Sequence, residues 1–201
     1  MSKYFDVYIV GLGGQGVLTI GELLAKAALK KGVPVNFYPT KGMSQRGGFV
    51  QGQLRFGREN VGPCLPNMGA DLLVSMERSE SLKCVKYTKK GSEFLLYDDT
   101  WFTTAVVTKK AEYPELDNVQ KEIKEAGAKL YCLSSGNLPT VDGVPVHANM
   151  YILGALLSNT ALKELFTLEE IIALTKEDFG KAAKSNIVAL EAGYASVLKP
   201  A

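Results

Sequence analysis

The 201-residue sequence has little histidine, little cysteine and almost no excess of charge. It contains one histidine, three cysteines and 23 basic against 21 acidic residues, a formal charge of +2. Proteins that bind nucleic acid along a surface usually carry a concentrated positive charge, so we expect no nucleic acid partner. The remaining composition is that of an average globular protein, which excludes collagen-like, coiled-coil and disordered chains. At this length we expect a single domain spanning residues 1–201.

The sequence also lacks a long apolar segment. No stretch of 18 apolar residues occurs, and Asp6 interrupts the first apolar run, so we expect neither a membrane span nor a signal peptide. These absences predict a cytoplasmic protein. Three cysteines at positions 64, 84 and 132 match no zinc or iron–sulfur spacing, and no metal site is expected. They are predicted to be free thiols, with Cys132 buried as a small apolar side chain.

What the sequence contains is an alternation of strand and helix patterns. A short apolar strand at 5–10 is followed by a helix from Val17, whose apolar residues recur on one face until Gly32 ends it, and by a strand at 33–38. These elements predict a βαβ unit. Further strands are predicted at 49–56, 70–76, 93–97 and 129–133, with helices at 77–85 and 118–126. This order favours an α/β fold with a Rossmann-like, mostly parallel sheet and helices on both faces.

The C-terminal part is predicted to be a helical tail that packs on the sheet. Within it, Thr167 and Glu170 form a capping box, and Phe166 and Ile171 occupy the flanking apolar positions. The last helix is predicted over about 181–198. Its apolar face would carry Ala183, Ile187, Leu190, Tyr194 and Val197.

A glycine-rich motif, GLGGQG at 11–16, directly follows the first strand. It satisfies G-x-G-x-x-G in a strand–turn–helix context, where backbone amides and the helix dipole attract an anion. A dinucleotide site also needs a carboxylate near the end of the second strand, where this chain has Asn36, Phe37 and Tyr38. The motif therefore predicts either an anion site or close packing of strand against helix, rather than an NAD site.

A second glycine-rich segment, KGMSQRGG at 41–48, follows the second strand. The carboxyl ends of parallel strands meet at one edge of a sheet, so we expect both glycine loops to share one crevice. Arg46 could bind a carboxylate or phosphate through its guanidinium group, or could hold a tight turn by bonding its carbonyls. Both interpretations stay open.

The sequence offers few candidates for catalysis. His147 begins a helix with an apolar stripe, so a capping or buried structural role is expected rather than proton transfer. No nucleophile elbow, P-loop lysine or HExxH motif is present, and no catalytic residue is predicted. Alone, the chain looks catalytically incomplete.

Three segments resemble a known family. The stretches GLGGQGVLTIGELLAKAA (11–28) and KGMSQRGGFVQGQLRFG (41–57), at this separation, resemble the gamma-type subunit of 2-oxoacid:ferredoxin oxidoreductases. Within that family they are most similar to the small beta subunit of the indolepyruvate enzymes. The stretch HANMYILGALL (147–157) resembles the family's asparagine–methionine helix. The resemblance covers nearly the whole chain.

This resemblance implies one subunit of an enzyme that decarboxylates a 2-oxoacid on thiamine diphosphate. Electrons would pass through iron–sulfur clusters to ferredoxin, and the product would be an acyl-coenzyme A. The chain has no Gly-Asp-Gly motif and no cysteine set for a cluster, so both cofactors are expected on alpha- and beta-type partner subunits.

The resemblance also implies that the glycine loops face the shared active-site region, with coenzyme A as the candidate ligand. The candidate binding residues are Gly11, Gly13, Gly14, Gln15, Gly16, Gln45, Arg46 and Gly47. Two alternatives stay open at this point: a stand-alone nucleotide-binding oxidoreductase or regulatory module, and a purely structural subunit whose loops only dock a partner.

Overall fold

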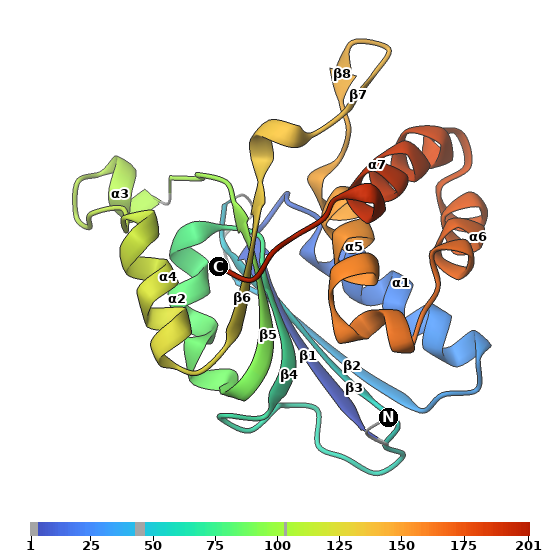
Figure 1. Cartoon of the computed structure of the whole chain (residues 1–201), viewed down its shortest axis with the longest axis horizontal. Coiled ribbons are helices and arrows are strands. Elements are labelled where there is room, and N and C mark those ends of the chain that lie inside the picture. The colour runs from blue at the N-terminus through green and yellow to red at the C-terminus, as the bar shows by residue number, and fades with distance from the viewer. Residues whose placement is uncertain (1–3, 43–46, 103) are drawn as a thin grey trace.

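The computed structural model describes residues 4–42, 47–102 and 104–201, and it consists of a central β-sheet between two layers of helices (Figure 1). The sheet has six strands in the order β2-β3-β1-β4-β5-β6. Its strands are β1 (Phe5–Leu12), β2 (Val35–Lys41), β3 (Phe49–Phe56), β4 (Ala70–Ser75), β5 (Thr88–Asp98) and β6 (Lys129–Ser134). A separate hairpin is formed by β7 (Thr140–Val141) and β8 (Val144–Pro145).

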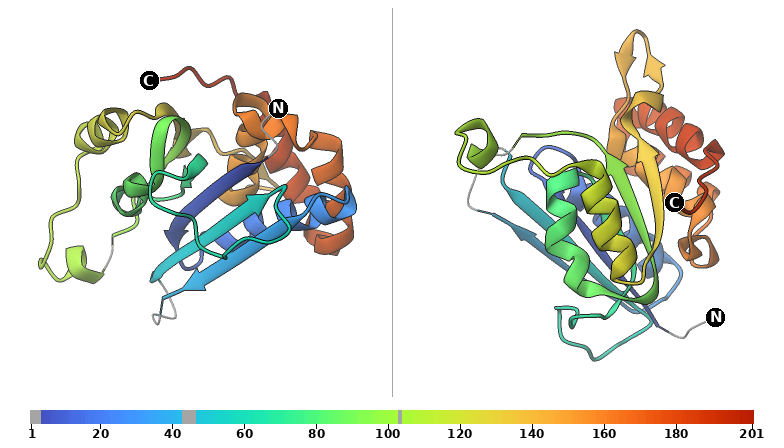
Figure 2. Two further views of the ribbon diagram at one scale, coloured as in Figure 1. Left: turned by 90° about the horizontal axis from the view of Figure 1, so that it is seen from below. Right: turned by 60° about the vertical axis from the view of Figure 1, so that its left-hand side comes forward.

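The helices divide between the two faces of the sheet. Figure 2 shows α2 and α4 side by side on one face, while the C-terminal helices and α1 lie on the other. The helices are α1 (Val17–Lys30), α2 (Arg78–Cys84), α3 (Thr104–Val107), α4 (Leu116–Glu125), α5 (Ala148–Asn159), α6 (Leu168–Phe179) and α7 (Ala183–Ala195). Among the described residues, no helix combines the length and apolarity needed to cross a membrane.

The sheet confirms the predicted fold class and changes one detail of the predicted βαβ unit. Strands β1, β4, β5 and β6 run parallel to one another. Strand β3 lies between β1 and β2 and is antiparallel to both. The short glycine-rich connection after β2 is the reason, because it returns the chain as a hairpin, and a hairpin partner is antiparallel. The helical tail packs on the sheet as expected.

Helices α5 and α7 pack with their backbones in direct contact. A Cβ atom at Gly154 would lie 2.0 Å from the Leu190 carbonyl oxygen, and one at Gly193 would lie 1.9 Å from the Tyr151 carbonyl oxygen. Only glycine permits so close an approach. This contact decides which face of α7 turns inward.

The predicted inward face of the last helix was partly wrong. Helix α7 ends at Ala195, before Val197, which is 84% exposed. Its buried residues are Ala183, Asn186, Ala189, Leu190 and Gly193. The glycine contact rotates the helix so that small and polar residues face α5, whereas Tyr194 is exposed. The predicted capping box of α6 is confirmed, and Phe166 and Ile171 are both buried beside it.

The cysteines are free thiols, as predicted, but their burial differs from the prediction. Cys84 is the fully buried one, and burial raises the pKa of its thiol. Cys132 is only half-buried because it stands on β6, the edge strand of the sheet. No group of three potential metal ligands occurs within the described ranges of the chain.

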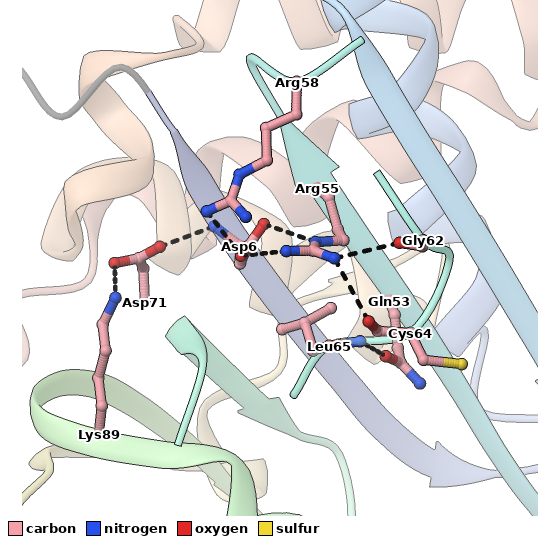
Figure 3. Close-up of polar contacts among 9 residues, drawn as sticks. All are labelled: Asp6, Gln53, Arg55, Arg58, Gly62, Cys64, Leu65, Asp71 and Lys89. Carbon is pink, nitrogen blue, oxygen red and sulfur yellow. Dashed lines mark hydrogen bonds and ion pairs between the residues drawn. The ribbon is translucent and has the colours of Figure 1, made fainter. Parts of the chain in front are cut away.

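A buried ion-pair network holds the end of the sheet opposite the glycine loops (Figure 3). The Asp6 carboxylate accepts hydrogen bonds from Arg55 Nε at 3.3 Å and from the terminal nitrogen Nη2 of the same guanidinium at 3.4 Å. Arg58 forms a further ion pair with Asp6, at 3.2 Å. Asp6 and Arg55 are almost fully buried, so each charge depends on the other for compensation.

The same polar face of β3 holds the long loop that follows it. Arg55 also donates to the carbonyl oxygens of Gly62 and Cys64, at 3.1 and 3.4 Å. The Gln53 side-chain oxygen accepts a hydrogen bond from the Leu65 amide at 2.6 Å. These contacts explain why polar residues occupy one face of a central strand: they replace a helix as the cover of that part of the sheet.

Replacing Asp6 with alanine is expected to lower the free energy of unfolding by about 3 kcal/mol, because Arg55 is left as an uncompensated buried charge. Urea denaturation of the purified chain measures this change. Asp178→Ala is the matched control, because it removes an ion pair to the exposed Lys26 and should cost much less. Equal losses in the two variants would contradict the assignment.

Candidate functional site

The two glycine-rich segments meet at the edge of the sheet where β1 and β2 end. The Gly13 amide donates to the Gly48 carbonyl oxygen at 2.8 Å, and the Gly47 amide donates to the Gly13 carbonyl oxygen at 3.4 Å. The prediction that both loops share one edge is therefore confirmed. Gln45 and Arg46 lie outside the described residues.

Gln15 holds the first glycine turn to the neighbouring strand. Its side-chain oxygen accepts a hydrogen bond from the Leu12 amide at 2.8 Å, and its side-chain nitrogen donates to the Met76 carbonyl oxygen at 2.8 Å. A Cβ atom at Gly11 would lie 2.7 Å from that side-chain oxygen. The side chain of Gln15 and the missing Cβ of Gly11 thus serve the packing of the turn, which leaves only their backbone groups for a ligand.

Gly14 and Gly16 adopt the left-handed backbone conformation, with φ of 104° and 82°. Gly16 is the N-cap residue of α1, which has no side-chain cap and no acidic residue in its first turn. The positive end of the α1 dipole is therefore not neutralised by a side chain of its own first turn. Such an end favours an anion.

Three hollows surround this turn, and Gly14 lines all of them. The glycine cleft, about 520 Å³, lies between the two loops and is lined by Gly13, Gly16, Thr19, Lys41 and Gly42 among others. The aromatic pocket, about 240 Å³, includes Tyr97, Asp99, Trp101, His147 and Asn149. The asparagine pocket, about 270 Å³, includes Gly16, Thr19, His147, Asn149, Phe179 and Asn186.

Lys41 supplies the charge of the glycine cleft. It is the last residue of β2, it is exposed, and it is the one charged residue among those lining the cleft in the described part of the chain. A lysine opposite an uncapped helix N-terminus makes the cleft electropositive. The cleft is thus suited to phosphate or carboxylate groups.

The expectation for His147 was wrong. It occupies the N-cap position of α5 but makes no side-chain capping bond, and its side chain is exposed. Its place on the connection that enters α5 at the sheet edge puts the imidazole at the rim of both the aromatic and the asparagine pocket. The residue is therefore available to a ligand rather than buried in the core.

Sequence reasoning missed Asn149, which touches the motif directly. Asn149 is buried on α5, and a Cβ atom at Gly16 would lie 2.4 Å from its side-chain nitrogen. The third glycine of the motif therefore makes room for an amide of another helix. The available signal was a polar residue at the start of an otherwise apolar helix.

The segment after β5 forms the outer wall of the aromatic pocket. Trp101 Nε1 donates to the Asp99 carboxylate at 2.8 Å. Farther along the same segment, the Tyr113 hydroxyl donates to the buried carboxylate of Glu77. Burial raises the pKa of the Tyr113 phenol, so the group stays protonated and donates at neutral pH. This bond anchors the end of the wall to the start of α2.

Comparisons with known proteins bear on the whole chain. The family model described as "Pyruvate ferredoxin/flavodoxin oxidoreductase" matches residues 6–196. The indolepyruvate oxidoreductase subunit IorB of Thermococcus kodakarensis is 34% identical over 83% of this chain and 86% of its own length.

Two solved structures share the fold. Pyruvate oxidoreductase subunit PORC from Thermotoga maritima has a TM-score of 0.70 at 22% identity, covering 98% of both chains. The 2-oxoglutarate:ferredoxin oxidoreductase from Magnetococcus marinus has a TM-score of 0.64 at 19% identity, covering 97% of this chain and 31% of that one. The fold thus occurs both as a separate subunit and as part of a longer chain.

Gly16→Ala is expected to lower the free energy of unfolding by about 2–4 kcal/mol, since left-handed strain adds to the collision with Asn149. Gly32→Ala is the control, because Gly32 also has a positive φ, 67°, but nothing lies within 4 Å of its added Cβ. That variant should lose only about 1 kcal/mol. Chemical denaturation measures the free energy of unfolding of both variants. Equal losses of stability would show that the contact with Asn149 does not restrict position 16.

Proposed function

Since this chain belongs to the pyruvate ferredoxin/flavodoxin oxidoreductase family, we propose that it binds the anionic part of coenzyme A for catalytic subunits of the same enzyme. One observation carries the proposal: two glycine turns meet beside an uncapped helix and Lys41, forming an electropositive cleft. The relatives are subunits of 2-oxoacid oxidoreductases, so the chain is a small subunit of an oxidoreductase complex.

The redox cofactors are assigned to the partners in this proposal. The described residues contain no set of ligands for an iron–sulfur cluster, and the sequence contains no Gly-Asp-Gly motif for thiamine diphosphate. When bound to a partner, thiamine diphosphate supplies the decarboxylation chemistry, and the clusters carry electrons to ferredoxin. This chain then contributes binding and orientation.

The cleft fits the phosphate groups of coenzyme A. Gly14 lets a ligand approach the backbone closely, because a Cβ atom there would meet only Trp101, at 4.0 Å, and the first-turn amides of α1 can donate to phosphate oxygens. Lys41 would neutralise part of the negative charge. The Magnetococcus marinus enzyme, which shares this fold, was solved with coenzyme A and succinyl-CoA bound, and this supports the choice of ligand.

Exposed apolar side chains near the same edge support a partner subunit. Figure 1 shows α3 and the β7–β8 hairpin extending beyond the sheet at the end that carries the glycine loops. Phe102 and Val107 are 61% and 68% exposed on the first projection, and Val144 is 66% exposed on the second. Apolar groups on two projections can dock against a partner subunit without changing the core.

Replacing Lys41 with methionine in the reconstituted complex is expected to raise the KM for coenzyme A about fivefold with little change in kcat. A phosphate remote from the reacting thiol interacts equally in the ground and transition states. Lys124→Met, on the exposed side of α4, is the control. Identical KM values in both variants would remove Lys41 from the proposal.

Arg46→Ala, a substitution motivated by the sequence alone, is expected to raise the same KM. Unchanged turnover, coenzyme A affinity and assembly would exclude a role for Arg46.

Leaving this chain out of the reconstituted complex is expected to abolish coenzyme A-dependent reduction of ferredoxin, while the partners keep their cofactors. Ferredoxin reduction and cofactor content are measured on the same preparation. Full activity without the chain would favour a purely structural subunit. Reduction of a nicotinamide nucleotide by the isolated chain would favour the stand-alone oxidoreductase instead.

A further inference from the structure

Two buried asparagines line the asparagine pocket without a hydrogen-bond partner for their side chains. Asn149 on α5 is 8% exposed and Asn186 on α7 is 3% exposed. Within the residues that the structure describes, neither side-chain amide donates or accepts a hydrogen bond. Neither amide is among the fully enclosed polar atoms without a partner in the described residues, so the amide atoms open onto the pocket. Both amides border the pocket, so a ligand there can satisfy them.

The pocket also collects the starts of three helices. Its lining includes Gly16, His147 and Ala182, the N-cap residues of α1, α5 and α7. None of these helices has a side-chain cap or an acidic residue in its first turn. Helix α7 continues directly from the 3-10 turn at Gly180–Ala182, whereas α1 and α5 begin at the pocket without such a turn. Helix N-termini carry partial positive charge, so the starts of α1 and α5 favour an anion there.

The lining carries no acidic side chain in the described ranges, although it also includes Phe179, the last residue of α6, where the helix dipole is negative. The Thr19 hydroxyl, in the first turn of α1, adds a donor to the two amides. Together with the backbone amides at the helix starts, these donors can satisfy the oxygens of a phosphate group.

We propose that the asparagine pocket is a phosphate-binding site in which Asn149 and Asn186 donate hydrogen bonds to the phosphate oxygens. It adjoins the glycine cleft through Gly14, Gly16 and Thr19, so a ligand with several phosphates can occupy both. Assigning this phosphate to coenzyme A rests on the proposed function. The phosphate site itself does not.

The close contact of α5 with α7 gives the pocket its rigidity. Gly154 and Gly193 bring the two backbones together a few residues beyond the asparagines. The separation of the two amides is therefore set by packed backbone rather than by flexible side chains. Preorganised donors bind an anion at a lower entropic cost than a mobile pair does.

Thermal unfolding of the full chain in sodium phosphate, compared with sodium chloride of equal ionic strength, tests the site. A ligand that binds only the folded state raises the melting temperature. Phosphate is expected to stabilise the wild type and Asn118→Asp, whose new charge lies on the exposed side of α4. Asn149→Asp should lose the response, since a carboxylate repels the phosphate.

Thr19→Val and Asn186→Asp keep the test decisive where Asn149→Asp fails to fold. Thr19→Val removes one donor without adding charge, and should weaken phosphate binding about tenfold in a calorimetric titration. Absence of any phosphate response in the wild type would overturn the proposal. So would responses of Asn149→Asp and Asn186→Asp equal to that of Asn118→Asp.

Parallel titrations with inorganic phosphate, 3′,5′-ADP and coenzyme A distinguish this site from the proposed function. Loss of all three responses in Asn186→Asp would support both the site and its assignment to coenzyme A. Binding of inorganic phosphate without coenzyme A would keep the phosphate site and reject that assignment. Binding of coenzyme A that is unchanged in both asparagine variants would overturn the site while leaving the proposed function intact.

Discussion

The backbone of Gly13 pairs with the segment at Gly47 and Gly48, and this contact ties the end of β1 to the start of β3. Gly47 takes part with a positive φ of 65°, a backbone conformation that favours glycine. The pairing lets β3 enter beside β1, which makes the sheet antiparallel at this point and brings Lys41 to the mouth of the cleft. The electropositive rim follows from this one arrangement.

The helical layer adds a second constraint at the same edge. Gly154 and Gly193 allow α5 and α7 to touch, and Gly16 makes room for Asn149. Three features therefore depend on missing Cβ atoms: the entry of α1 beside Asn149, the crossing of α5 with α7 and the placement of the buried Asn149 amide. At the opposite end of the sheet, stability comes from charge, through Asp6 and Arg55.

The two ends of the sheet differ in role: the end with Asp6 stabilises the fold, and the end with the glycine turns is open to a ligand. At the end with Asp6, a loop is hydrogen-bonded to β3 and covers the sheet. These bonds stabilise the arrangement of the strands there. The end with the glycine turns keeps helix N-termini and amides without side-chain caps. The fold tolerates uncapped helix starts at this edge because apolar cores on both faces of the sheet stabilise the rest of it.

Local patterns in the chain were enough to predict the alternating elements, the mostly parallel sheet, the capping box at Thr167 and the meeting of the two glycine loops. The first three depend on periodicity or on residues near in sequence, and the fourth follows from the rule that the carboxyl ends of parallel strands lie at one edge of a sheet. Local patterns did not predict four other features: the insertion of β3, the inward face of α7, the exposure of His147 and the place of Asn149. They depend on how closely two backbones from distant segments approach, and that distance is decided only when the packed elements meet in three dimensions.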